Sequence, residues 1–345
     1  MKISVIVVTY NSMRYLPDFI DSIFNQSYFN NHNLTPDILV VDNASTDGTV
    51  KFIKDNYPTV HLLRNINNIG LPRAWNQAIK ITQGEYILIM NPDLILHQDF
   101  ISQAIKVIQT DQTVASVGGK LYQLKLVSFD DDIGIGGLEK TNILDSCGLQ
   151  TFKNRSFTER GAGEVDQGQY NQPQEIFGIS GACVLYRRQA LEQIKFNDEY
   201  FDEDFFLYKE DIDMAWRLRL AGWSSIYTPQ AIGYHHRRAR SLKNKSSFNI
   251  IHYHRRKEAF VNFYSYRNHL LLLRKNIIYK NFLTHALFIC FYELKKFIYV
   301  LILENSTLRH TLKDLIKLNR QQRKKRQLNM RLKKVKADEI QAWFE

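Results

Sequence analysis

The chain opens with a largely apolar run at residues 3–8 that is rich in β-branched side chains and is interrupted only by Ser4. Such a run is typical of a strand buried on both faces of a parallel sheet. Strand-like and helix-like segments then alternate as far as residue 109, which predicts βαβ units and a mostly parallel α/β sheet flanked by helices. We expect further strands at residues 38–41, 60–63 and 86–90, and helices at residues 16–25, 49–56, 70–82 and 99–109.

The charge of the chain is divided unevenly along its length. The 345 residues carry a net charge of +11. The chain is 44% hydrophobic, and its length and hydrophobic content are enough for one large domain with a hydrophobic core and an additional region. Residues 1–234 hold 20 Lys and Arg against 28 Asp and Glu, a balance of −8, whereas residues 235–345 hold 26 against 7, a balance of +19. We therefore predict an α/β domain at residues 1–240 and a helical, basic region at residues 241–345.

Cysteine usage and the first residues favour a cytoplasmic protein. Cys147, Cys183 and Cys290 are far apart and in no CxxC arrangement, which argues against a disulfide framework and against a zinc site. The apolar run at residues 3–8 is too short for a signal peptide, and no small-residue cleavage site follows it.

Polar residues follow the predicted strands where ligands bind to α/β sheets, outside the carboxyl ends of the strands. Thr9, Tyr10 and Asn11 follow the first strand, and Asp42 ends the second. A carboxylate at that place could accept a hydrogen bond from the N–H of a pyrimidine base, with Tyr10 offering an aromatic face. The alternative is that Asp42 and Ser45 only order a turn and cap the helix near Thr49. Both interpretations can hold together, because Asp47 can cap while Asp42 binds.

The segment from Gly70 to Asn76 begins a helix and is a candidate diphosphate site. Backbone donors and the helix dipole favour an anion at such a terminus, and Arg73 adds a full charge. The alternative is that Pro72 simply occupies a first helical position and that Arg73 is solvated.

Asp93 is the candidate metal ligand. It follows the predicted strand at residues 86–90 in the run Asn91-Pro92-Asp93, and Pro92 fixes the backbone direction. A lone carboxylate can hold Mg²⁺ or Mn²⁺ when phosphate oxygens and water fill the other positions. The acidic run at residues 130–132 is a competing metal motif, but its polar, glycine-rich surroundings favour a solvated loop.

A second group of candidate residues comes later in the chain. Residues 177–186 are expected to form a strand whose small residues let an acceptor approach the backbone. Glu210, Asp211 and Asp213 fall in the first turn of a helix that ends at Gly222. Dipole and capping preferences alone can explain acidic residues there. Their aromatic neighbours favour a function, since partly buried carboxylates can have a raised pKa suited to general-base work.

Taken in order, these motifs resemble the GT-A-fold glycosyltransferases of family 2, and within them the rhamnosyltransferase-like branch. The resemblance covers about residues 1–240. The matching segments are residues 4–11, 40–48, 91–93, 180–182 and 210–223.

The resemblance assigns roles to the candidate residues. It implies an inverting reaction by direct displacement, in which Asp211 is the base, Glu210 orients or binds the acceptor, and no covalent intermediate forms. It implies Asp93 and His235 as metal ligands, with His236 in reserve. Asn-Pro-Asp stands here for the usual Asp-x-Asp, so the metal is expected to be held less tightly. The expected nucleotide site comprises Thr9, Tyr10, Asn11, Asp42, Asn68, Gly70, Arg73 and Asn91, and the expected acceptor site comprises Gly181, Ala182 and Glu210.

Without the resemblance, the pair His235-His236 ahead of Arg237 is typical of a basic surface turn.

The C-terminal region has the pattern of an interfacial helix. Two apolar runs at residues 286–292 and 297–303 are split by charged residues, and no stretch reaches the ~18 to 20 apolar residues of a membrane-spanning helix. His285, Glu293, Lys296 and Glu304 fall roughly on one helical side. We expect this helix to lie on an anionic leaflet. A dimerisation helix, and hence a homodimer, is the alternative.

The basic tail at residues 320–336 could reinforce membrane docking, bind nucleic acid or stay solvated. We expect no nucleic acid as a partner, since no recognised nucleic-acid-binding fold accompanies the charge.

The sequence thus predicts a cytoplasmic glycosyltransferase that is peripheral on the inner face of the cell membrane and acts in surface polysaccharide assembly. It would move a sugar, rhamnose by the resemblance, from dTDP-rhamnose or a UDP-sugar to a hydroxyl of a lipid-linked or polysaccharide acceptor. One alternative is a nucleotidyltransferase that makes a sugar nucleotide, which would need a glycine- and lysine-rich loop after the first strand. The other is a non-catalytic glycan-binding protein, for which intact Asp93, Glu210 and Asp211 are poor support.

Overall fold

The computed structural model describes residues 2–128, 136–236 and 259–344. The acidic run at residues 130–132 and the basic pair at residues 237–238 lie outside these ranges, so the interpretations given to them stay predictions.

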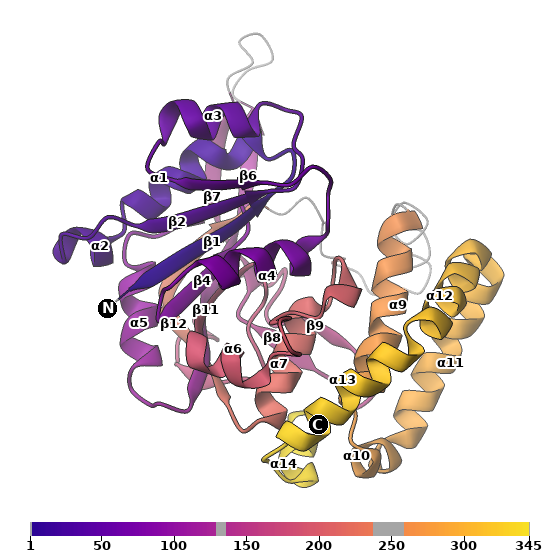
Figure 1. The fold of residues 1–345 in the computed structure, drawn as a ribbon. Helices are drawn as coiled ribbons and strands as arrows, with labels where there is room; N and C mark the ends of the chain where they lie inside the picture. The colour runs from indigo at the N-terminus through magenta and orange to yellow at the C-terminus, as the bar shows by residue number, and fades with distance from the viewer. Residues whose placement is uncertain (1, 129–135, 237–258, 345) are drawn as a thin grey trace.

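A single mixed sheet of ten described strands forms the middle of the molecule (Figure 1). The first strand, β1 (Ile3–Thr9), lies between β2 (Asp37–Asp42) and β4 (Tyr86–Met90), and β3 (His61–Arg64) pairs with β2, all in parallel. The next strand across, β11 (Cys183–Arg187), is antiparallel to β4. The rest of the sheet contains β5 (Leu94–Leu96), β6 (Val114–Ser128), β7 (Gly136–Ser146), β10 (Gln174–Glu175) and β12 (Ser224–His235).

Helices cover both faces of the sheet, because successive strand residues point to opposite sides. Ile3, Val5 and Val7 of β1 pack with α1 (Leu16–Phe24), α2 (Ser27–Asn31), α3 (Thr49–Asn56) and α5 (Phe100–Ile108). Ile6 and Val8 pack with α4 (Leu71–Ile81), α6 (Arg188–Ile194) and α7 (Glu210–Leu220). The predicted α/β architecture, a sheet between two layers of helices, is confirmed.

Two sequence-based boundaries need correction. The strand expected over residues 177–186 begins only at Cys183. The preceding segment instead packs against α7, where a Cβ added at Gly178 would lie 2.2 Å from the Cβ of Ala215, and the carbonyl of Gly178 accepts from the N–H of Leu149 at 2.9 Å. His235, which without the resemblance is expected in a surface turn, is the final residue of β12.

The C-terminal helices pack against the outer side of α7. They are α9 (Ala259–Asn276), α10 (Tyr279–Thr284), α11 (Ala286–Leu303), α12 (Asn305–Lys317), α13 (Asn319–Leu332) and α14 (Ala337–Gln341). Trp216 and Leu220 of α7 share a core with Leu271, Leu272 and Phe344. Helix α7 is therefore enclosed between the sheet and the helical region.

Short elements complete the description. They are η1 (Met13–Tyr15), β8 (Leu149–Thr151), β9 (Phe157–Glu159), η2 (Glu203–Phe205) and η3 (Ala342–Phe344). Within the described ranges, each helix is too short or too polar to cross a membrane.

Candidate active site

The predicted site residues lie along one edge of the sheet. Thr9 is paired with Asp42 at the ends of β1 and β2, and Met90 at the end of β4 is paired with Cys183. Just beyond that pair, the N–H of Asn91 donates to the carbonyl of Ala182 at 2.8 Å. The carboxyl ends of three parallel strands and the start of β11 therefore form a continuous row.

Thr9 and Asp42 form a buried pair at this edge. The hydroxyl of Thr9 donates to Oδ1 of Asp42 at 2.9 Å, and the N–H of Ser45 donates to Oδ2 at 3.0 Å. Both side chains are fully buried. The turn-ordering interpretation of Asp42 is therefore confirmed, whereas its contact with a base stays a prediction. Tyr10 beside it is exposed, as a stacking residue needs to be.

The loops after β1 and β2 are joined into one rigid unit. Asn11 has a φ of 51° and exchanges bonds with the other loop: its N–H donates to Oγ of Ser45 at 2.9 Å, and its Oδ1 accepts from the N–H of Thr46 at 2.9 Å. The carboxylate of Asp47 accepts from the N–H of Thr49, the first residue of α3, at 3.1 Å. The capping contact expected of Asp47 is thus present.

The N-terminus of α4 is bound to the loop that precedes α7. Oδ1 of Asn68 accepts from the N–H of Gly70 at 3.0 Å, and the carbonyl of Phe206 accepts from the N–H of Leu71 at 2.7 Å. Gly70 has a φ of 86°, and a Cβ there would lie 2.6 Å from the ring of Phe206. Glycine is therefore required at this contact.

Arg73 is exposed but is not simply solvated, because it is paired with a carboxylate. Its Nε lies 3.2 Å from Oε2 of Glu203, which belongs to the same loop before α7. Binding of an anion by Arg73 would have to share or replace this ion pair. Its part in diphosphate binding stays a prediction.

Asp93 and His235 meet, and a third residue orients the histidine. Nε2 of His235 is 3.2 Å from Oδ1 of Asp93, and Nδ1 is 2.7 Å from Oδ2 of Asp145. His235 is only 4% exposed, so the interpretation as a basic surface turn is wrong for this residue. Burial by itself lowers the pKa of His235, but the hydrogen bonds with Asp145 and Asp93 outweigh it and raise the pKa to about 9.

Asp145 is a site residue that the sequence analysis missed. It is buried in β7, 90 residues before His235 in the chain. The one available signal was an Asp directly after the apolar pair Ile143 and Leu144 in a strand-like segment, where an unpaired charge is costly. Nothing in the spacing indicated its partner.

The cluster of Asp93, Asp145 and His235 has one feature of a divalent-cation site, which is the way the histidine is held. Among the described residues there is no cluster of three or more His, Cys, Asp or Glu arranged as a metal site. However, a histidine whose other ring nitrogen is held by a carboxylate is the usual arrangement around protein-bound metals. Asp93 and His235 would supply two donors, and phosphate oxygens and water the others, as small hard cations accept.

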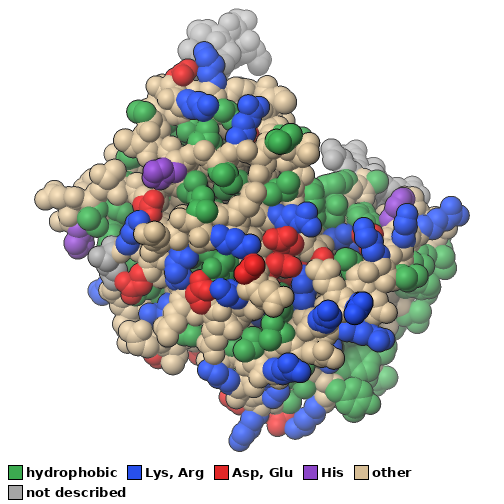
Figure 2. Space-filling model, in the orientation of Figure 1, with side chains coloured by type: hydrophobic (Ala, Val, Ile, Leu, Met, Phe, Trp, Pro, Cys, Tyr) green, Lys and Arg blue, Asp and Glu red, His purple; other side chains and the backbone are tan. Residues whose placement is uncertain are grey.

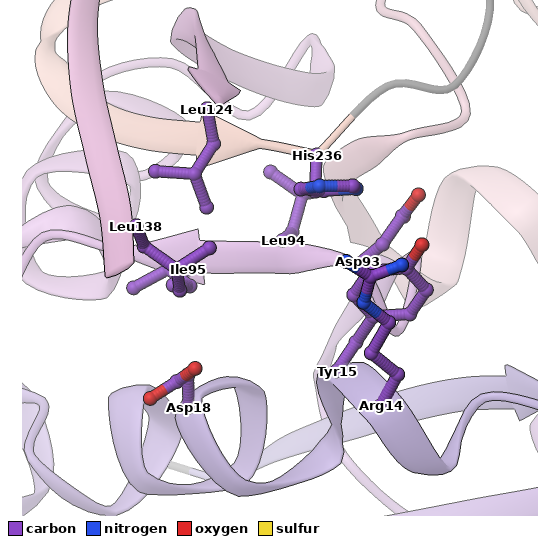
Figure 3. A pocket seen from close by; sticks show the side chains of 9 residues that line it. All are labelled: Arg14, Tyr15, Asp18, Asp93, Leu94, Ile95, Leu124, Leu138 and His236. Atoms are coloured by element: carbon purple, nitrogen blue, oxygen red, sulfur yellow. The ribbon is translucent and has the colours of Figure 1, made fainter. Parts of the chain in front are cut away.

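A pocket of about 290 Å³ opens beside Asp93 (Figure 3). The rings of Tyr15 and His236 pack at 4.9 Å on one side of it. The pocket combines charged groups with an apolar wall, and the sequence analysis named only Asp93 and His236 of its lining. The remaining lining residues are Arg14, Asp18, Leu94, Ile95, Leu124 and Leu138.

Asp211 is the one residue of α7 that is not buried. Its Oδ2 accepts from the N–H of Gly181 at 3.0 Å, and its Oδ1 accepts from the N–H of Ile212 at 2.8 Å. A Cβ added at Gly181 would lie 3.1 Å from the Cβ of Asp211. Gly181 thus lets the carboxylate approach the backbone next to Ala182, close to the end of β4.

Glu210 is adjacent in sequence but is only 6% exposed. Its Oε2 has no hydrogen-bond partner among the described residues. Burial and the neighbouring charge of Asp211 raise its pKa to about 8. Its surroundings therefore favour the protonated carboxyl, which can donate a hydrogen bond. No side chain caps α7.

The loop before α7 is held by the C-terminal helices. Nδ2 of Asn268 in α9 lies 2.8, 2.7 and 2.8 Å from the carbonyls of Phe205, Leu207 and Tyr208. Phe206, Tyr208 and Lys209 have positive φ values in this loop. Asn268 was not among the predicted residues, because the composition of this region indicated only a membrane or dimerisation element.

Comparisons with known proteins agree on the family. The family model of glycosyl transferase family 2 matches residues 4–195, more than half of the chain, and that of glycosyl transferase family group 2 matches residues 141–308. An N-acetylglucosaminyl-diphospho-decaprenol L-rhamnosyltransferase of Mycobacterium tuberculosis is 25% identical over 229 residues, 63% of this chain and 71% of its own. The abequosyltransferase RfbV of Salmonella typhimurium is 36% identical over 107 residues, 30% of this chain and 31% of its own.

Two solved structures show the same GT-A fold. The S. aureus TarS 1–349 structure in complex with UDP-GlcNAc matches with a TM-score of 0.51 at 17% identity, over 91% of this chain and 80% of that one. The structure of GalNAc-T7 with UDP, GalNAc and Mn²⁺ matches with a TM-score of 0.55 at 12% identity, over 80% of this chain and 48% of that one.

Proposed function

The chain belongs to glycosyl transferase family 2. From that premise we propose that it transfers rhamnose from a nucleoside-diphosphate donor to a hydroxyl of a lipid-linked or growing polysaccharide, with inversion of the anomeric centre of the sugar. The observation that carries the proposal is the contact between Asp211 and the N–H of Gly181. It leaves the one unburied side chain of α7 beside the carboxyl end of β4.

The proposed reaction is a single displacement. The acceptor oxygen attacks C1 of the donor sugar, the bond from C1 to the diphosphate oxygen breaks, and the hydroxyl proton passes to Asp211. The two backbone N–H groups on Asp211 fix its carboxylate in one orientation. A positioned base of this kind contributes roughly 10²- to 10⁴-fold in rate. Protonated Glu210 would donate a hydrogen bond to an acceptor oxygen.

The donor would lie along the loops after β1, β2 and β4. We propose that Asp42 accepts from the base, that Tyr10 stacks on it, and that Asn11 and Asn91 line the nucleotide. Asn68 and Gly70 shape the turn into α4, and Arg73 would exchange Glu203 for a diphosphate oxygen.

Mg²⁺ or Mn²⁺ would be held by Asp93 and His235, with Asp145 orienting the histidine. When bound, such a cation neutralises charge on the departing diphosphate.

The choice of rhamnose and of a lipid-linked acceptor is supported by the Asn-Pro-Asp run and by the mycobacterial relative. With that acceptor, the enzyme would work in the cytoplasm, peripheral on the inner face of the cell membrane. The donor would be dTDP-rhamnose, with a UDP-sugar as the second choice.

Calorimetry on the full chain with a panel of sugar nucleotides, with and without Mn²⁺, tests the donor. We expect dTDP-rhamnose to bind most tightly and to release dTDP when an acceptor is present. Tighter binding of another sugar nucleotide would overturn the choice of rhamnose. Release of pyrophosphate from a nucleoside triphosphate would indicate a nucleotidyltransferase, and binding of glycan without any sugar nucleotide would indicate a glycan-binding protein.

The variant Asp211→Asn tests the base. We expect kcat to fall by roughly 10²-fold or more, because the amide cannot take the proton, while the donor dissociation constant stays unchanged. Asp55→Asn, an exposed carboxylate on α3, is the matched control and keeps full activity. Full activity of Asp211→Asn would exclude the assigned base.

A further inference from the structure

Helix α11 turns Glu293 and Lys296 towards the protein and most of its apolar side chains outward. Oε1 of Glu293 is 2.6 Å from Nε2 of His269, and Oε1 of Glu304, just after the helix, accepts from Asn262 at 3.0 Å. The ammonium of Lys296 lies 5.5 Å from the ring centre of Tyr266. The polar side that the sequence indicated therefore faces α9 and not the solvent.

The outward face is an uninterrupted apolar stripe. Leu287 is 86% exposed, Phe291 72% and Ile302 70%. Their spacing, filled by Leu294 and Ile298, follows one side of a helix. The helix has 18 residues and is about 27 Å long, and the stripe follows it over most of that length. Isolated exposed apolar residues need no explanation, but a contiguous patch indicates an interaction surface.

The exposed charges beside this stripe are positive. The three acidic residues between residues 286 and 332 are Glu293, Glu304 and Asp314, and each is bound inward; Asp314 pairs with Arg267 at 2.7 Å. Figure 2 shows hydrophobic side chains along the lower right edge, over α11, next to a field of Lys and Arg side chains. The exposed cations are Lys295, Arg309, Lys313, Lys317, Arg320, Arg323 and Lys324.

We propose that α11 is the docking surface for an anionic lipid bilayer and lies flat in its interface. The apolar stripe would enter the boundary between headgroups and acyl chains, and the Lys and Arg residues of α12 and α13 would contact anionic headgroups. The purpose of such docking rests on the proposed function, because a lipid-linked acceptor lies in that interface.

A second copy of the chain fits this surface less well. Pairing two α11 stripes about a two-fold axis would bring two basic C-terminal regions together, each with a balance of +19 over residues 235–345, from 26 Lys and Arg against 7 Asp and Glu. Like charges across an interface oppose association. Glu293, Glu304 and Asp314 are bound to residues of the same chain, so they offer little negative charge to offset this repulsion.

Vesicle flotation with the full chain, without donor or acceptor, tests the proposal. We expect the protein to float with vesicles that contain phosphatidylglycerol, and far less with vesicles of phosphatidylcholine alone or at high salt. The triple variant Leu287→Gln/Phe291→Gln/Ile302→Gln should lower the bound fraction by about tenfold or more. Its thermal unfolding should not change, because all three side chains are exposed in the folded protein.

The matched control is Ile66→Gln, which replaces an apolar residue that is 93% exposed on the loop after β3. It should bind vesicles like the unaltered chain. Equal binding by the triple variant and the unaltered chain, or no binding of either to anionic vesicles, would overturn the proposal. So would a stable lipid-free dimer that the triple variant converts to a monomer, since a second copy would then cover α11. Donor binding measured by calorimetry on the same samples reports separately on the proposed function.

Discussion

Two neighbouring carboxyl groups at the start of α7 have opposite surroundings. Asp211 is open on one side and receives two backbone N–H groups, whereas Glu210 is buried with an unpartnered oxygen. One carboxylate can therefore take a proton while its neighbour keeps one. Environment, and not residue type, separates the two roles.

The buried carboxyl of Glu210 makes stability depend on pH. Its pKa is raised from 4.5 to about 8 by burial and by Asp211. Between these values the unfolded chain has lost the proton and the folded chain still holds it, so stability falls as pH rises towards 8. Glu210→Gln has no such proton to lose, so its free energy of unfolding should not fall with pH in this way. Over this pH range the variant should therefore gain stability relative to the unaltered chain by a few kcal/mol, roughly 1.4 kcal/mol for each pH unit.

Urea unfolding at pH 5 and at pH 8.5 measures this difference. Glu139→Gln, an exposed residue of β7, is the control and should show none. A Glu210→Gln effect of the same size at both pH values would contradict the assigned environment.

Asp145 should act through His235. Asp145→Ala removes the acceptor of the Nδ1–H group, so the ring is no longer held, and we expect Mn²⁺ affinity to fall by roughly 10- to 100-fold. Titration calorimetry with Mn²⁺ in the presence of nucleotide reads this out, while nucleotide binding without metal should stay unchanged. Glu139→Ala on the same strand serves as control. Unaltered Mn²⁺ affinity would remove Asp145 from the site.

At the scale of elements, α7 depends on α9 and α13 through buried charges. Lys275 of α9 contacts Asp202 and lies 2.9 Å from Oδ1 of Asp213, and Lys325 of α13 lies 3.1 Å from Asp204 and also contacts Asp202. Burial alone raises the pKa of Asp202, but the two lysines outweigh it and hold that pKa far below its usual range. The contacts join the helical region to the loop before Asp211.

The pair Lys325 and Lys324 tests this coupling. Lys325→Met leaves buried carboxylates without one of their cations and should lower the free energy of unfolding by about 3 kcal/mol. Lys324→Met, one residue earlier and exposed, should change it by less than about 0.5 kcal/mol. Chemical denaturation of both variants gives the comparison, and equal effects would show that the ion network is not what joins the elements.

At the scale of the molecule, the division into residues 1–240 and 241–345 stays a prediction, but the two parts share a core. Trp216 is buried against Phe344 and the side chains of α9. Removing the helical region would expose that core and the buried carboxylates of residues 202 and 213.

A fragment of residues 1–240 should therefore not fold stably. We expect it to lack a cooperative thermal transition or to aggregate, whereas the full chain unfolds cooperatively; calorimetry and light scattering distinguish these cases. A fragment with a cooperative transition near that of the full chain would show that the shared core is dispensable.

Helix α11 also links the proposed membrane surface to the site. Its Glu293 contacts His269, which follows Asn268 in α9, and Asn268 holds the loop before α7. Figure 1 shows α11 on the side of the helical region that faces away from the sheet. Two contacts thus separate α11 from the loop that precedes α7 and Asp211.

The sequence by itself determined the α/β alternation and the row of polar residues at the strand ends. Apolar periodicity is local, and the carboxyl ends of neighbouring parallel strands must share an edge. Thr9, Asp42 and Asn91 could be named for this reason, whereas Asp211 was named from the acidic first turn of a helix and from the family resemblance.

Only the tertiary structure decided which distant groups meet and which side of a helix is inside. Asp145 contacts His235, which lies 90 residues later in the chain. Asn268 donates to carbonyls of the loop before α7, about 60 residues earlier in the chain. Glu293 and Lys296 turned inward, although the pattern of α11 gave two faces without saying which one contacts the protein. Burial and pairing depend on packing between segments far apart in the chain, and residue spacing does not record that packing.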